Sequence, residues 1–175
     1  KEEVAVQGSR TAINISGINV EEIQRWSVVA LSGQYQPTRL LDVEFRSLPD
    51  ISASLKHSTE VKLFLGTAEA LGRVRLLGQE ELAPGQKGWL QLELKEPVVA
   101  LRGDHYILRR PSPGETLGGG LVIDPHPNGR HKRFSDEVLA NLESMSRGSP
   151  VEVLRQAWLA LGPTTIQEAV RRARL

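Results

Sequence analysis

A glycine-rich segment, Thr116-Leu-Gly-Gly-Gly-Leu-Val-Ile-Asp124, is the first candidate for ligand chemistry in this chain. Consecutive glycines bind a phosphate when they open a helix, because backbone N–H groups at a helix N-terminus face the anion. Here the glycines lead into Leu121-Val-Ile-Asp124, which reads as a β-strand. We therefore interpret them as a close strand crossing or a β-bulge rather than a phosphate loop.

Clusters of basic residues are the second candidate. They are Arg109-Arg110, Arg130-His131-Lys132-Arg133 and Arg171-Arg172-Ala173-Arg174. Such clusters neutralise phosphates and release counterions, which makes nucleic-acid binding depend on salt. A solvated surface is the alternative for each cluster, and the net charge of +1 by itself indicates no partner.

Metal binding and catalysis are not indicated by the residue pattern. The four histidines, His57, His105, His126 and His131, have no cysteine partner and no H-x-x-x-H spacing. His126 and His131 flank a Pro-Asn-Gly stretch and are predicted to face solvent. No G-x-S-x-G elbow and no G-x-x-x-x-G-K-[ST] loop occurs. We expect no enzymatic activity and no cofactor in this chain.

Alternating apolar residues predict six β-strands between residues 39 and 124. The clearest alternations are Leu41/Val43/Phe45, Val61/Leu63/Leu65 and Leu90/Leu92/Leu94. Turn signals such as Pro84-Gly85 and Gly103-Asp104 separate the strands. This spacing favours an antiparallel barrel or sandwich, and a closed barrel leaves no free edge.

A helical period replaces the strand period after the linker Pro125-His-Pro-Asn-Gly129. Ser135 is placed to cap a helix that carries Val138, Leu142 and Met145 on one face.

Two further helices are expected in the last thirty residues. Ser149-Pro150-x-Glu152 opens one whose apolar stripe includes Trp158, so Trp158 is predicted to be buried. Thr165-x-x-Glu168 is a capping box that opens the other. Two helices joined by Gly-Pro-Thr are consistent with the start of a winged-helix module or with a simple helical packing unit.

The composition is that of an ordinary globular protein. Apolar residues make up 39% of the chain and charged residues 25%, and there is no cysteine. No apolar run is long enough to span a membrane and no secretory signal opens the chain. We expect a cytoplasmic protein with no membrane partner.

Several motifs together resemble SelB, the selenocysteine-specific translation elongation factors related to EF-Tu. Gly103-Asp104-His-Tyr-Ile-Leu-Arg109, followed by a turn and Thr116–Asp124, resembles the end of the family's third domain. Gly8–Ile18 resembles the closing strand of the second domain, and Pro84-Gly85 with Trp89–Leu94 resembles a middle strand of the third. The resemblance spans about residues 7 to 133. The chain departs from the family at Arg25-Trp26, where glycine usually follows the arginine.

The resemblance implies a mainly β fold with an α-helical C-terminus, centred on an EF-Tu-like antiparallel β-barrel. The implied organisation is a remnant of domain 2 over 1–35, the domain 3 barrel over 36–125, and a helical linker with the first helices of a winged-helix module over 126–175. Family members begin with a GTPase domain, which nothing here matches. GTP and magnesium would belong to that missing domain.

The function implied by the resemblance is to bind selenocysteinyl-tRNA for delivery to the ribosome at a recoded UGA codon. Further partners would be the G domain of the same protein and, through further C-terminal modules, an mRNA hairpin. The implied tRNA contacts are Arg10, Lys56, His57, Thr67, Arg109, Arg110 and Thr116. Arg10 would face the aminoacyl group, where its guanidinium suits an ionised selenol; an exposed arginine paired with Glu3 is the alternative. The barrel of another translation GTPase, or a protein-interaction module that docks on a G domain, are the other interpretations.

Overall fold

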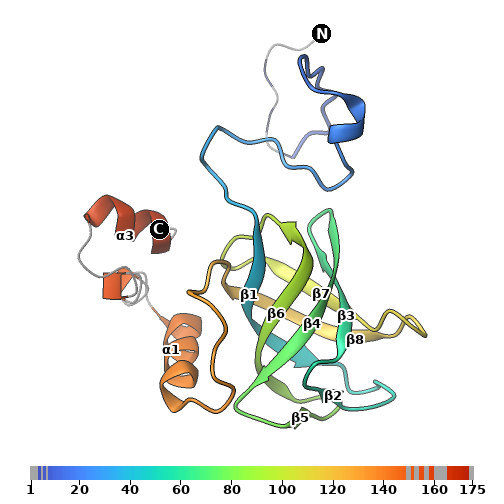
Figure 1. Cartoon of the computed structure of the whole chain (residues 1–175), viewed down its shortest axis with the longest axis vertical. Coiled ribbons are helices and arrows are strands. Elements are labelled where there is room, and N and C mark those ends of the chain that lie inside the picture. The colour runs from blue at the N-terminus through green and yellow to red at the C-terminus, as the bar shows by residue number, and fades with distance from the viewer. Residues whose placement is uncertain are drawn as a thin grey trace.

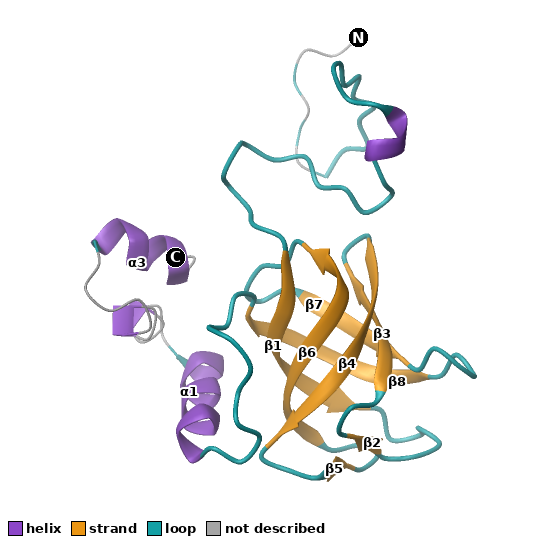
Figure 2. Cartoon of the chain, viewed as in Figure 1, coloured by secondary structure: helices purple, strands orange, loops and turns teal. Residues whose placement is uncertain are grey.

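A β-barrel forms the centre of the molecule, as the computed structural model in Figures 1 and 2 shows. The structure describes residues 4, 6, 8–148, 151, 154–155, 158–159 and 165–173, without the side chains of 171–173. The strands are β1 (Thr38–Ser47), β2 (Leu55–Lys56), β3 (Glu60–Leu65), β4 (Ala68–Leu77), β5 (Glu81–Leu82), β6 (Lys87–Val98), β7 (His105–Arg109) and β8 (Thr116–Asp124).

Six of these strands close the barrel in the order β1-β6-β4-β3-β7-β8, and β8 pairs back with β1. All strand pairs are antiparallel. The mainly β fold and the closed barrel are confirmed. The count of six strands between residues 39 and 124 is too low, because β2 and β5 form a separate two-stranded sheet. Strands of two residues are too short to produce an alternation in the sequence.

The interior of the barrel contains the residues that the alternation placed there. Leu41, Val43 and Phe45 of β1 are fully buried, as are Leu90 and Leu92 of β6. Burial of one such side chain contributes about 1.5–3 kcal/mol relative to exposure. The period-2 pattern therefore identifies the side chains that form the core of the barrel.

The glycines of β8 lie where neighbouring backbones approach closely. A Cβ atom on Gly120 would lie 1.9 Å from the carbonyl oxygen of Glu44 in β1. A Cβ on Gly119 would lie 2.3 Å from the carbonyl oxygen of Tyr106 in β7. Both distances are far inside van der Waals contact, so these positions require glycine. The predicted close strand crossing is confirmed, and the segment is a strand.

Helix α1 (Asp136–Arg147) packs against the outside of the barrel. Its N-cap is Ser135, whose side chain accepts a hydrogen bond from the backbone N–H of Val138, as predicted. Leu142 is buried against Leu77 and Ile123 of the barrel. Side chains packed around this cluster are Trp89, Leu121, Val138, Leu139 and Met145. The apolar face predicted for this helix is thus the face that docks.

The N-terminal segment contributes no strand among its described residues, 4, 6 and 8–37. Its only regular element is the 3-10 turn η1 (Val20–Glu22). The strand expected over Gly8–Ile18 is not formed, which corrects that expectation. An extended segment becomes a strand only beside a partner that accepts its backbone hydrogen bonds, and among the described residues no strand pairs with this one.

The C-terminal tail ends in helix α3 (Ile166–Ala173). Thr165 and Glu168 exchange side-chain-to-backbone hydrogen bonds of 3.2 and 3.3 Å, which confirms that capping box. Trp158 is 39% exposed, so the prediction that it is buried is wrong. Of the other described residues of this stripe, Val151 is exposed and Leu154 is half-buried. The helix start expected at Ser149–Pro150 lies outside the described residues.

None of the helices in the described part of the chain is long and apolar enough to cross a membrane.

Candidate nucleic-acid interface

Five of the seven residues implied as tRNA contacts gather at one end of the barrel. At this end β1 and β7 finish, β3 and β8 begin, and the small β2–β5 sheet lies, so we call it the β2–β5 end (Figure 1). The five residues are Lys56, His57, Arg109, Arg110 and Thr116. The arrangement follows from antiparallel pairing, which brings alternate strand ends to the same side.

Arg109 and Thr116 are direct partners across the β7–β8 pair. Arg109 is also paired with Lys62 across β3–β7, so three polar side chains form a row over adjacent strands. Arg109 and Thr116 are exposed. The Arg109 guanidinium donates to the carbonyl of Gly114 in the turn, which directs the side chain along the β7–β8 turn. The Lys62 ammonium lies 2.6 Å from the carboxylate of Glu69 on β4 in a half-exposed ion pair.

Arg110 is part of the framework of this end rather than its exposed surface. Its Nε lies 3.1 Å from the carboxylate of Glu115, and one of its terminal nitrogens is buried without a hydrogen-bond partner. The same carboxylate accepts hydrogen bonds from the backbone N–H and the hydroxyl of Ser52. These bonds, those from Ser52 first, hold the pKa of Glu115 below its usual range. Arg110 therefore braces the turn that presents Arg109 and Thr116.

Lys56 and His57 differ in what they offer to a ligand. Lys56 is exposed at the end of β2. His57 is half-buried, and its Nδ1 is buried without a partner. Burial, and then the positive charges of Arg133 and Arg75, lower the pKa of His57. The imidazole is therefore neutral at neutral pH and offers hydrogen bonding rather than charge.

Thr67 and Arg10 lie away from this end. Thr67 is in the β3–β4 turn, five residues along the chain from Lys62, which corresponds to about 16 Å of extended strand. It lines a groove of about 570 Å³ between the opposite barrel rim and Trp26–Val28. Arg10 is exposed in the N-terminal segment, and Glu3, its alternative partner, lies outside the described residues. The structure does not bring these two residues into the cluster.

The second basic cluster, residues 130–133, binds the barrel itself. The Arg133 guanidinium donates to the carbonyls of Leu76 (3.2 Å) and Gln79 (3.0 Å) at the end of β4. Arg130 forms an ion pair with Glu93 of β6. The charge of Arg130 is paired with Glu93, and the Arg133 guanidinium also lies 3.0 Å from the carboxylate of Glu80, so both charges are neutralised within the chain. The cluster therefore attaches the segment after β8 to the barrel.

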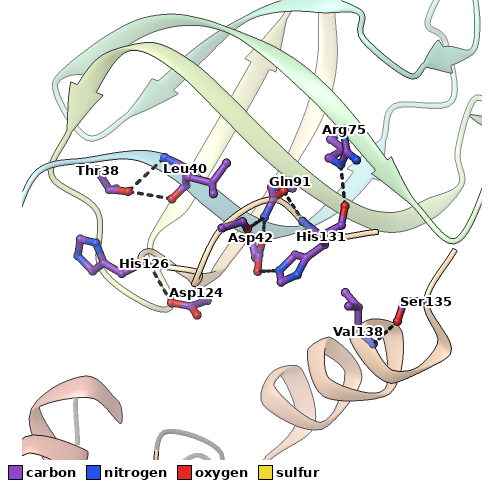
Figure 3. A network of polar contacts seen from close by, with 11 residues as sticks. Thr38, Leu40, Asp42, Arg75, Gln91, Asp124, His126, His131, Ser135 and Val138 are labelled. Atoms are coloured by element: carbon purple, nitrogen blue, oxygen red, sulfur yellow. Dashed lines mark hydrogen bonds and ion pairs between the residues drawn. The ribbon is translucent and has the colours of Figure 1, made fainter. Parts of the chain in front are cut away.

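His131 is bonded to the barrel, so the prediction that it faces solvent is wrong. Its Nε2 lies 2.6 Å from a carboxylate oxygen of Asp42, and its side chain is only 25% exposed (Figure 3). His126 is half-buried, with its backbone N–H donating to Asp124 (2.8 Å). The sequence suggested solvent exposure because proline, asparagine and glycine usually mark free loops. Here the loop lies over a polar row on the barrel.

That polar row, which sequence reasoning missed, crosses four neighbouring strands. Register pairs Arg75 with Gln91, Gln91 with Asp42, and Asp42 with Asp124. Gln91 is 0% exposed and Asp42 is 2% exposed, although both occupy outward positions of their strands. No single strand's pattern reveals the row. The row could be predicted only by noticing that outward-facing polar residues on four strands are aligned. That alignment requires the strand register, which the sequence alone does not give.

The comparisons with known proteins agree with the fold and its location in the chain. The sequence model of the selenocysteine-specific elongation factor β-barrel domain matches residues 43–129. The selenocysteine-specific elongation factor of Desulfomicrobium baculatum is 34% identical over 152 residues, which are 87% of this chain and 24% of that protein. The chain thus spans about a quarter of the length of the curated relative it matches.

A solved structure shows the same fold. The crystal structure of the bacterial selenocysteine-specific elongation factor EF-Sec matches with a TM-score of 0.60 and 22% identity, over 79% of this chain and 21% of that one. The family match extends from within β1 to beyond the end of β8, and the curated relative has the same family name. This chain, with its six-stranded barrel, belongs to the selenocysteine-specific elongation factor family.

Proposed function

We propose that this barrel binds selenocysteinyl-tRNA through the surface around the β2–β5 end, for delivery to the ribosome at a recoded UGA codon. The observation that carries the proposal is the gathering of five family-implied residues at one end of a barrel that belongs to this elongation factor family. A factor of this kind works with the ribosome in the cytoplasm. Recognition of an mRNA hairpin would require further modules.

The roles of the five residues differ by their surroundings. Exposed Lys56 and Arg109 supply charge for phosphates, and exposed Thr116 supplies a hydroxyl for a 2′-OH or phosphate oxygen. Arg110 holds the turn in place through Glu115. RNA read in this way is recognised by backbone shape more than by base sequence.

The test is a salt titration of selenocysteinyl-tRNA binding to the full chain and to Arg109→Ala and Lys56→Ala. Each variant should bind more weakly, and the slope of log affinity against log salt should fall by about one per removed phosphate contact. Arg39→Ala is the matched control, because Arg39 is exposed at the opposite end of the barrel. Equal losses in all three variants, or binding indifferent to salt, would contradict the proposal.

A second candidate function is docking of a G domain on the outer face of β3, β7 and β8. Ile107 is 50% exposed there, and its register neighbours are Phe64 on one side and Gly119 on the other. GTP and magnesium would then be bound by the docked G domain, and we propose that this chain alone neither binds nor hydrolyses GTP. Calorimetry with GTP tests the latter point. Ile107→Asp should weaken capture of a G domain added in trans while leaving tRNA binding by the chain unchanged.

A further inference from the structure

The segment between β8 and α1 is attached to the barrel by a network centred on buried polar side chains. Gln91 donates from Nε2 to Asp42 (2.9 Å) and to the carbonyl of Gly129 (3.0 Å). Its Oε1 accepts the backbone N–H of His131 (3.1 Å). Arg75 donates from Nε to the carbonyl of His131 (2.9 Å). Both backbone groups and the side chain of His131 are therefore held by the barrel (Figure 3).

One further contact continues the attachment toward α1. The backbone N–H of Gly78 donates to the carbonyl of Arg133 (2.6 Å). Arg133 is followed at once by Phe134 and by Ser135, the cap of α1. Ser135, the N-cap of α1, is thus only four residues beyond His131 along the chain.

We propose that residues 129–133 form a proton-controlled clamp that holds α1 to the barrel, closed when the imidazole of His131 is protonated against Asp42 and loosened when that proton leaves. The clamp acts on the junction between the barrel and α1. It does not depend on RNA binding, and its test needs no RNA.

The charges around His131 favour its protonated form. The hydrogen bond to Asp42 raises the pKa of His131 above 6.5, and Asp124 of β8 acts in the same direction. Burial of the imidazole and the guanidinium of Arg75 oppose the rise. The pKa of Asp42 is itself raised, because burial outweighs its bonds to His131 and Gln91. Of the neighbouring charges on the segment and β6, Arg130 is neutralised by Glu93.

The direction of the pH effect follows from the raised pKa of His131. A group whose pKa is higher in the closed state than in the open state stabilises the closed state fully below the open-state value. That stabilisation is lost as pH rises from about 6.5 through the raised pKa. Asp42 faces His131, so variants at each of the two positions separate the two titrations.

The experiment is amide hydrogen exchange on the full chain between pH 6 and pH 9, corrected for the intrinsic pH dependence of exchange. Protection of the His131 amide and of the α1 amides should fall as pH rises through the window, while the barrel amides of β3 and β7 stay protected. At pH 6 the protection factors of these amides should be about tenfold or more lower in His131→Gln than in the unmodified chain. The protection that remains in the variant should not change with pH. Lys132→Gln is the matched control, because Lys132 is the exposed cation next to His131 and should behave as the unmodified chain.

A second readout uses Trp89, which packs in the cluster under α1. With Trp26→Phe and Trp158→Phe in the background, its emission should shift to longer wavelength as pH rises, and His131→Gln should abolish that titration. Asp42→Asn provides an independent variant with the same expected loss of pH dependence. Flat protection of α1 in the unmodified chain, or the same titration in His131→Gln, would overturn the clamp. If Asp42→Asn unfolds the barrel, the β3 and β7 amides will lose their protection from exchange. In that case the result for His131→Gln alone tests the clamp.

Discussion

Two outer faces of the same barrel differ in their exposure: one is covered by the chain's own C-terminal part and the other is open to solvent. The covered face, formed by β4, β6 and β1, carries Arg75, Gln91 and Asp42 and is overlaid by residues 129–133 and by α1. The bare face, formed by β3, β7 and the first half of β8, carries Ile107 and Arg109 and remains exposed. The second half of β8, with Leu121 and Ile123, packs under α1 and belongs to the covered face. Both faces alternate polar and apolar residues in the same way. Polar residues on the outside of a sheet therefore do not by themselves identify the surface that meets a ligand.

The difference between the faces lies in how their polar groups are satisfied. On the covered face the donors and acceptors are bonded to the chain's own segment, at distances of 2.6–3.1 Å. On the bare face the ion pair between Lys62 and Glu69 is half-exposed, and exposed pairs contribute about 0–1 kcal/mol. We conclude that stability is concentrated on the covered face, whereas the bare face is free to tolerate change and to bind partners.

The largest expected effect on stability is in β8, the strand that lies between the covered face and the bare face. Gly120→Ala should destabilise the barrel by at least about 3 kcal/mol, because its Cβ would meet the carbonyl oxygen of Glu44, which the β1–β8 ladder prevents from moving. Chemical denaturation measures the loss. Gly66→Ala is the control: its Cβ enters open space, and its φ of +55° predicts a cost of only about 1–2 kcal/mol.

Next in size is the apolar half of the covered face. Leu142→Ala should cost about 2–4 kcal/mol of α1 docking, because the side chain is buried against Leu77 and Ile123. Trp89 emission and the thermal melt report it. The bare-face counterpart, Ile107→Ala, should cost less than about 1 kcal/mol, and equal costs at the two positions would remove the distinction between the faces.

The polar half of the covered face should show a smaller effect. Gln91→Leu removes donors and an acceptor that serve Asp42, Gly129 and His131, and leaving such groups unsatisfied costs about 1–3 kcal/mol. Protection of the His131 amide should fall with it. Arg46→Leu, a change at an exposed position near the end of β1, should change the melt little. A comparable loss there would argue against the comparison.

The smallest effect is expected in the tail. Trp158→Ala should lower the free energy of unfolding by less than about 1 kcal/mol, because Trp158 keeps 39% of its surface exposed. A cost of 3 kcal/mol or more would mean that Trp158 is buried in solution after all. Selenocysteinyl-tRNA titration of the same variant shows whether its exposed ring contributes to binding.

Local patterns were sufficient wherever the answer depends on one element. The alternation in β1 and β6 identified the core side chains, and Ser135 identified the start of α1. The glycines of β8 indicated a close strand crossing or a bulge, and the structure shows the close approach of neighbouring backbones. These features depend on backbone geometry and on the period of a single strand or helix. Both can be recognised from residues that are close together in the sequence.

Tertiary structure alone decided which polar residues are covered and which patches are free. Alternation told which side of the sheet Asp42 and Gln91 occupy, but only strand register aligned them, and only the path of residues 129–133 buried them. The helical period placed Trp158 on an apolar stripe, but it did not determine whether a surface exists for that stripe to pack against. Burial depends on elements far apart in the sequence, and a short-range pattern carries no information about them.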